Sequence, residues 1–246
     1  MRFIYLILAF SLLTTSFFAA NAQAQEALSK SDVEDIIKDY LMDNPELILD
    51  SLDAYRAKQE EMEKASAEES IDKNIDYLTS KNAPSVGPVD ADVTVVEFFD
   101  YNCGYCRKAL PDIQTLAKED KKVRFVFREM PILSPNSAEV SKWALAAHKQ
   151  GKYFEMHSAL MDQRGTRTAD TIKKLAEELG LDVGKLEKDA NSDAVKTELE
   201  KDMMMAREIG IRGTPAFIID GQLYPGYLGE DGLKQAIETA RKNGDK

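Results

Sequence analysis

The chain has 246 residues, a formal net charge of −11 and only two cysteines. This length allows one large domain, or a small domain beside a medium one. An acidic chain without a cluster of Lys and Arg is a poor nucleic-acid binder and has no evident attraction to anionic lipid, so we expect neither partner.

The first 24 residues have the pattern of a secretory signal peptide. Arg2 precedes an apolar run, and Ala20-Asn-Ala22 and Ala22-Gln-Ala24 both resemble cleavage sites. A membrane anchor is the alternative, but Ser11 and the polar stretch 14–16 interrupt the run and make it marginal for a span. We therefore expect cleavage and a mature periplasmic protein, in a compartment where disulfides persist.

Residues 25–82 predict an N-terminal helical segment. The run Ser31 to Glu34 fits a capping box, and Pro45 can open a second helix. Apolar residues recur at helical spacing in both helices, at Val33, Ile36, Ile37, Tyr40 and Leu41 and then at Ile48, Leu52, Tyr55 and Met62. This face must pack on the rest of the chain or on copies of itself. We favour self-association, because a highly charged stretch follows Lys58.

Residues 83–246 predict an α/β domain. After a turn at 84–88, the elements expected are strands at 93–99 and 123–128 with a helix at 107–117 between them, a helical block at about 135–209, strands at 216–219 and 222–224, and a last helix at 233–241. The helical block contains helices at 137–150, 152–161, 168–179 and 186–209. The first strand, helix and strand imply a right-handed parallel βαβ unit.

Both cysteines lie between the first strand and its helix, as Cys103-Gly-Tyr-Cys106. Random placement puts two cysteines three apart in roughly 1 case in 120, and closing so small a ring adds only about 2 kcal/mol of stability. The spacing therefore suggests chemistry, and at a strand-to-helix junction it is typical of a thioredoxin-like redox site. Free N–H groups and the helix dipole would lower the pKa of Cys103, the attacking sulfur, while Cys106 one turn later resolves the mixed disulfide.

Two motifs resemble a known family. The stretch Glu97-Phe-Phe-Asp-Tyr-Asn-Cys103 is similar to the active-site region of the DsbA-like thiol–disulfide oxidoreductases, and Arg212-Gly-Thr-Pro215 is similar to their cis-proline loop. The resemblance covers about residues 86–246 and implies a thioredoxin fold with an inserted helical domain. It also implies that Cys103 is the nucleophile, that Cys106 is the resolving thiol, and that a cis Pro215 sets the Thr214 backbone against the Cys103 sulfur, where a substrate can pair as a short strand.

Glu97 is the remaining candidate site residue. A carboxylate in the middle of a buried apolar strand is unusual, and its position matches the buried acid of the family. It could accept the Cys106 proton with a raised pKa. The alternative is a carboxylate at a strand edge, or one paired with a lysine such as Lys108.

The residue at 105 bears on the direction of the exchange. Strongly oxidising DsbA proteins carry a histidine there, whose cation helps to hold the thiolate, whereas Tyr105 offers only a hydrogen bond. The Gly-Tyr pair and Thr214 resemble those of the disulfide isomerase DsbC, and the N-terminal segment resembles that of ScsC-type proteins, several of which are trimeric. An isomerase gains from several sites held around one substrate.

We therefore predict a periplasmic disulfide isomerase, a homotrimer that acts on unfolded or misoxidised secreted proteins and is recycled by a DsbD-like or DsbB-like membrane partner. The alternatives are a dedicated dithiol oxidase and a non-catalytic copper- or zinc-binding chaperone. Zinc needs about four ligands, and beyond the cysteines only His148 and His157 are available. No cofactor is expected beyond the redox-active Cys103–Cys106 pair.

Overall fold

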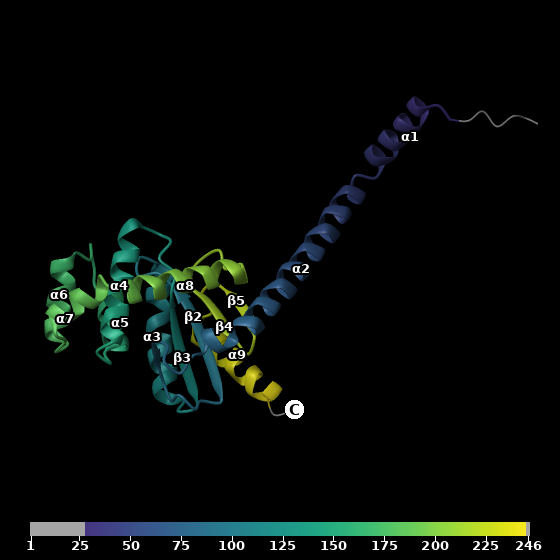
Figure 1. The fold of residues 1–246 in the computed structure, drawn as a ribbon. Helices are drawn as coiled ribbons and strands as arrows, with labels where there is room; N and C mark the ends of the chain where they lie inside the picture. The colour runs from purple at the N-terminus through teal and green to yellow at the C-terminus, as the bar shows by residue number, and fades with distance from the viewer. Residues whose placement is uncertain (1–27, 245–246) are drawn as a thin grey trace, which may run out of the picture. The chain divides into compact units, whose positions relative to one another are not determined.

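The computed structural model describes residues 28–244, and the chain divides into two compact units with a boundary between Ala57 and Lys58. Figure 1 shows the order of the helices and strands along the chain. The expected signal peptide, residues 1–24, lies outside the described residues. Among the helices of residues 28–244, none combines the length and the apolar character needed to cross a bilayer.

The first unit consists of α1 (Lys30–Asp43) and the beginning of α2 (Glu46–Leu78). The capping box predicted at Ser31 is wrong by two residues. Ser29 caps α1 instead, since its hydroxyl accepts from the Asp32 N–H while the Asp32 carboxylate accepts from the Ser29 N–H at 2.9 Å. A carboxylate on the third residue after a serine satisfies the same free donors that a glutamate would.

The apolar face of the first unit is exposed in this single chain. No residue of α1 is buried, and on α2 the side chains of Ile48, Leu52 and Tyr55 are 48%, 46% and 61% exposed. Exposed apolar patches rimmed by polar residues commonly mark an interaction site, so the face predicted from the sequence is present and uncovered.

The second unit is built on a five-stranded sheet in the order β1-β3-β2-β4-β5. The strands are β1 (Ser85–Val86), β2 (Val93–Phe99), β3 (Val123–Glu129), β4 (Ala216–Ile219) and β5 (Gln222–Pro225). β2 and β3 are parallel, as the βαβ pattern predicts, and the other pairs are antiparallel. β2 lies at the centre of the sheet, and six of its seven residues are buried.

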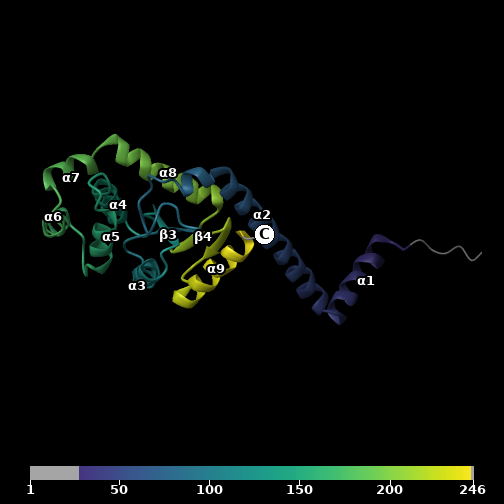
Figure 2. The same ribbon diagram turned by 90° about the horizontal axis from the view of Figure 1, so that it is seen from below.

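Helices cover both faces of this sheet, as Figure 2 shows for α3, α8 and α9. On one face, α3 (Gly104–Glu119) and α9 (Gly229–Gly244) bury side chains that include Leu110, Ile113 and Leu233. On the other face, α8 (Asp193–Ile209) and the end of α2 bury a separate cluster. The sheet with its two layers of helices is the thioredoxin-like core that the sequence predicts.

The end of α2 belongs to this second unit. Ala67, Ile71 and Leu78 are buried against the sheet, so the predicted self-associating segment, 25–82, contains a part that packs on its own domain. Arg124 and Arg128 of β3 fix the helix end, because their guanidinium groups donate to the carbonyl groups of residues 77–80. Arginine donors at helical carbonyls satisfy acceptors that the helix itself leaves free.

The inserted helices are α4 (Pro135–His148), α5 (Tyr153–Asp162), α6 (Ala169–Glu178), α7 (Val183–Ala190) and α8. They run from Pro135 to Ile209, as predicted for the insertion. Two details differ. The helix predicted at 186–209 is two helices, because the Ser192 hydroxyl accepts from the Val195 N–H and caps a new one. The stretch predicted as a turn contains β1, which pairs with β3.

Candidate active site

Cys103 lies at the N-cap of α3, directly after the central strand β2. The loop between them is held by Asp100, whose buried carboxylate accepts from the N–H of Asn102 at 2.7 Å and from the Ser137 hydroxyl at 2.8 Å. Its other oxygen accepts from the N–H groups of residues 132 and 133 at 2.8 Å each. Four donors fix this carboxylate, one from the loop itself and three from residues 132–137. The carboxylate therefore ties the loop that presents Cys103 to that segment.

The Cys103 sulfur is surrounded by hydrogen-bond donors. The Cys106 thiol lowers the pKa of Cys103 most, followed by the Thr214 side chain and by the N–H groups of Cys106 and Tyr105, which together outweigh burial and bring that pKa to about 5. The Cys106 N–H lies 3.4 Å from the sulfur. An ordinary cysteine has a pKa of about 8.5, so Cys103 is ionised at neutral pH.

Cys106 has the opposite electrostatics. Its side chain is 1% exposed, and burial, the hydrogen bond to Cys103 and the nearby Glu97 carboxyl all raise the pKa of Cys106 far above its ordinary value. Both cysteines are free thiols in this structure. One sulfur of the pair is therefore a ready nucleophile, and the other holds its proton until a base removes it.

The loop before β4 faces Cys103. The Thr214–Pro215 peptide bond is cis, as the resemblance implies. In its protonated form, the Cys103 thiol donates to the Thr214 carbonyl at 3.2 Å. Among the described residues, the buried Thr214 hydroxyl has no partner other than Cys103, which leaves it free to donate to the thiolate. The structure thus brings Cys103, Cys106, Thr214 and Pro215 together.

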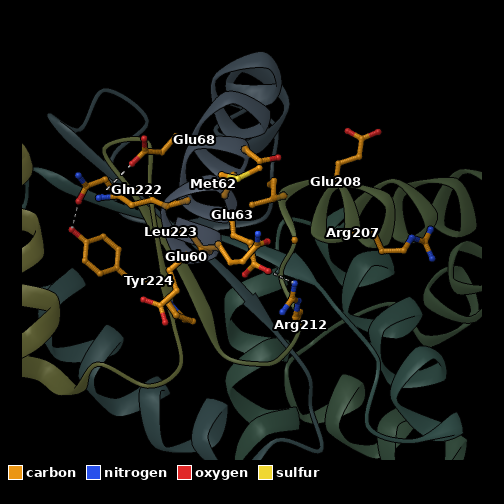
Figure 3. A pocket seen from close by; sticks show the side chains of 17 residues that line it. Glu60, Met62, Glu63, Glu68, Arg207, Glu208, Arg212, Gln222, Leu223 and Tyr224 are labelled. Carbon is orange, nitrogen blue, oxygen red and sulfur yellow. Dashed lines mark hydrogen bonds and ion pairs between the residues drawn. The ribbon is translucent and has the colours of Figure 1, made fainter. Parts of the chain in front are cut away.

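Arg212, the first residue of the same motif, contributes to a groove rather than to the cysteine pair. Its guanidinium group pairs with Glu63 of α2 at 3.0 Å on the wall of a groove of about 840 Å³ (Figure 3). The groove is lined by residues 59–68, 207–212 and 222–225. It lies next to the cis-proline loop, but none of the five predicted site residues lines it.

Glu97 is buried in the middle of β2, with 2% of its side chain exposed. Burial raises its pKa most, and negative charge at Cys103 and at Glu129 raises it further. Its Oε1 atom has no hydrogen-bond partner within residues 28–244. The alternative of a pair with Lys108 is not what the structure has, since that ammonium group lies 4.8 Å above the Tyr227 ring.

A further buried carboxyl, Glu129 at the end of β3, was not expected from the sequence. It accepts from Ser141 at 2.7 Å and from Tyr153 at 2.8 Å, and the Tyr101 hydroxyl lies at 3.4 Å. Tyr101 also lies 3.2 Å from Nδ1 of His157, which is buried and packs as a helix residue rather than as a metal ligand. The sequence signal for this cluster is a carboxylate directly after the predicted strand 123–128.

Tyr105, between the two cysteines, is exposed and stacks on the Tyr227 ring with centroids 6.2 Å apart. It therefore offers a flat aromatic surface beside Cys103. Within residues 28–244, no three side chains of His, Cys, Asp or Glu lie together in a way that could hold a metal ion.

This arrangement defines a class of protein. A thioredoxin fold, a Cys-x-x-Cys pair at the start of the first helix of the βαβ unit, and a cis-proline loop facing it are the parts of a thiol–disulfide exchange site. The chain belongs to the family of DsbA-like thioredoxin domains, whose model matches residues 94–238, more than half of the chain. The model of the N-terminal domain of the copper resistance protein ScsC matches residues 30–61.

Several solved structures are similar. A thioredoxin-like oxidoreductase from Silicibacter pomeroyi is 42% identical, with a TM-score of 0.64 over 68% of this chain and 97% of that one. BcfH from Salmonella enterica Typhimurium is 27% identical, with a TM-score of 0.73 over 86% and 95%. The thiol-disulfide exchange protein alpha-DsbA2 from Wolbachia pipientis is 27% identical, with a TM-score of 0.67 over 72% and 96%.

The chain spans about a quarter of the length of the curated relatives that it matches first. One of them is the Na(+)/H(+) antiporter NhaA 1 of Salinispora arenicola, which is 30% identical over 156 residues, 63% of this chain and 24% of that protein. The similarity to these antiporters is thus confined to one part of each of them.

Proposed function

We propose that this protein exchanges thiols and disulfides with protein substrates through Cys103, and that it rearranges client disulfides in preference to introducing them. The observation that carries the proposal is the environment of the Cys103 sulfur, which has donors on several sides and a pKa of about 5. A thiolate is the attacking species in disulfide exchange, and the facing cis-proline loop is where an extended client chain would pair beside it.

In isomerisation, the Cys103 thiolate attacks one sulfur of a client disulfide. A Cys103–client disulfide forms, the client disulfide breaks, and a client thiolate is released. That thiolate attacks a second client disulfide, and the last thiolate formed attacks the mixed disulfide and frees Cys103. No electrons are transferred overall. In the oxidase alternative, a client thiolate attacks the Cys103–Cys106 disulfide and the client gains a disulfide while the protein is reduced.

Three features support isomerisation. Tyr105 adds no cation beside the thiolate, so the reduced form lacks one source of stabilisation found in strong oxidants. The exposed apolar face of α1 and α2 fits self-association, with trimerisation as the proposed state, which would hold several sites around one client. The leader pattern of residues 1–24 supports the periplasm as the place of action.

The test is the refolding of scrambled ribonuclease and the oxidation of reduced ribonuclease, side by side. The chain should catalyse the first more than the second, and Cys103→Ser should remove both activities. Refolding by Cys103→Ser at the unmodified rate would end the proposal. A protein that purifies with stoichiometric copper or zinc and exchanges no disulfides would support the chaperone alternative instead.

The redox state of the two cysteines in living cells separates the two enzymatic alternatives. A mostly reduced pair would support the isomerase and a DsbD-like recycling partner, because attack on wrong disulfides requires the thiolate. A mostly oxidised pair would support the oxidase and a DsbB-like partner.

A further inference from the structure

The groove of about 840 Å³ on the second unit takes no part in the proposed exchange chemistry. Its walls come from three elements: residues 59–68 of α2, residues 207–210 of α8 and its end, and residues 222–225 of β5 (Figure 3). Arg212 of the cis-proline loop also lines it. The groove therefore reaches a point two residues before Thr214, whose carbonyl faces the Cys103 sulfur.

The wall formed by α2 distinguishes this groove from anything that the DsbA-like domain forms alone. The model of that domain matches residues 94–238, whereas α2 ends at Leu78. The end of α2 is fixed in place, because Ala67 and Ile71 are buried in the second unit and Glu63 pairs with Arg212 at 3.0 Å. The groove is thus a product of the end of α2 and the exchange domain together.

β5 lies at the edge of the sheet formed by residues 28–244, so one side of this strand has no neighbouring strand. Successive residues of a strand point to opposite faces of a sheet, yet all four residues of β5 line the groove. The groove therefore follows the open edge of the sheet and is not confined to one face. Backbone groups at an open edge are where an extended chain can add as a further strand.

The register of the hairpin identifies the backbone groups at this edge. A two-residue turn at 220–221 joins β4 and β5, with φ of 51° and 75°. The pair that flanks such a turn, Ile219 and Gln222, exchanges both backbone hydrogen bonds. Bonded and non-bonded pairs alternate, so the next residue, Leu223, points its N–H and C=O away from β4. Pro225 points its C=O the same way but has no N–H.

The side chains of the groove favour an apolar occupant. Charged residues of the walls pair with one another, and one such pair joins Lys64 and Glu68 at 3.8 Å. Met62 is 56% exposed, and Leu223 is half-buried against the apolar cluster beneath it. An extended segment with apolar residues at alternate positions can pair with β5 and lay those residues against Met62 and Leu223. Folded proteins bury such segments, whereas unfolded proteins expose them.

We propose that this groove binds an extended apolar segment of the unfolded client, paired with the edge of β5, while Cys103 attacks a disulfide of the same client chain. The proposal rests on the proposed function and deepens it, because a second contact retains the client between successive exchanges. β5 has only four residues, so the added strand is short and its affinity is low. A client that folds buries the segment and is released.

Unfolded ribonuclease with its cysteines reduced and carbamidomethylated is a probe that can bind but cannot exchange disulfides. Fluorescence anisotropy of the labelled probe gives its Kd for the full chain. Leu223→Pro removes the outward N–H and leaves the hydrogen bonds between β4 and β5 in place, so the Kd should rise about fivefold for the loss of one hydrogen bond. Met62→Glu, on the α2 wall, should raise the Kd as well and provides a second variant if Leu223→Pro folds poorly.

Two variants serve as controls. Met204→Glu places the same charge on α8, where Met204 is 43% exposed and does not line the groove, so the Kd should stay unchanged. Leu223→Ala keeps the outward N–H and shortens the side chain, so its Kd should stay below that of Leu223→Pro. Hydrogen exchange adds a local readout, because the Leu223 amide should exchange more slowly when the probe is bound.

An unchanged Kd in both Leu223→Pro and Met62→Glu, or an equal rise in Met204→Glu, would overturn the inference. A lower mass of folded Leu223→Pro in light scattering would also overturn it, since that result would assign the groove to a second copy of this chain. The probe undergoes no exchange, so its binding is measured independently of activity. Failure of the unmodified chain to refold scrambled ribonuclease would contradict the proposed function alone.

Discussion

The pKa of Cys103 is the most direct consequence of the geometry of the site, and single-cysteine variants can measure it. The Cys106 thiol is the largest of the groups that lower that pKa to about 5. A hydrogen bond to a charged group contributes about 1.5–3 kcal/mol, and one pKa unit corresponds to about 1.4 kcal/mol. Replacing Cys106 by Ala should therefore raise the pKa of Cys103 by about 1–2 units, to between about 6 and 7.

Cys106→Ser is the matched variant, since its hydroxyl is still a donor to the thiolate. The assay is the rate of alkylation of Cys103 by iodoacetamide between pH 3 and pH 9. At pH 6 a thiol with a pKa of about 5 is about 90% ionised, whereas a thiol with a pKa of about 7 is about 10% ionised. The Ala variant should thus react up to about tenfold more slowly at pH 6 than the Ser variant. Equal titration curves for the two variants, or midpoints near pH 8.5 for both, would refute the reasoning.

Three further predictions concern stability and assembly. Burial lowers the pKa of His157 to about 3, so below pH 6.5 the unfolded chain binds a proton that the folded chain does not. The free energy of unfolding should therefore fall by up to about 5 kcal/mol between pH 6.5 and pH 3. Urea titrations of His157→Gln should lack this loss. Arg128→Ala leaves Asp202 buried without its partner and should cost about 3–5 kcal/mol in urea unfolding, whereas Arg212→Ala, in an exposed pair, should cost less than about 1 kcal/mol. Leu52→Asp in the full chain should lower the mass measured by light scattering to that of a monomer, and an unchanged mass would remove the proposed self-association.

The central strand and the redox pair could be predicted from the sequence because their signals are local. The run from Val93 to Phe99 is β-branched or aromatic at six of its seven positions, the exception being Glu97, and the strand has the predicted bounds. Cys103 and Cys106 are three apart, so their contact needs only one helical turn. The cis-proline loop was located through its resemblance to a family, since nothing in the spacing from Cys103 to Thr214 places them in contact.

The parts that the sequence did not disclose depend on contacts between distant residues. The buried Glu129 carboxyl accepts hydrogen bonds from Tyr101, Ser141 and Tyr153, on three different elements. The boundary inside α2 has the same origin, because Ile71 and Leu78 continue the apolar pattern of a helix whether they face a second copy or their own domain. Only the fold shows that they pack on the sheet.

A deletion meant to remove the self-associating segment should therefore stop near residue 57. A deletion up to residue 80 would also remove Ile71 and Leu78 from the core of the second unit. Its product would lose stability for a reason unrelated to assembly.

Trapping a client on the Cys106→Ala variant tests the central claim most directly. With no resolving thiol, attack by Cys103 on scrambled ribonuclease should accumulate a covalent complex that a reductant dissolves, and mass spectrometry should locate its disulfide at Cys103. A complex that forms equally well when Cys103 is replaced and Cys106 is retained, or no complex at neutral pH, would contradict the account.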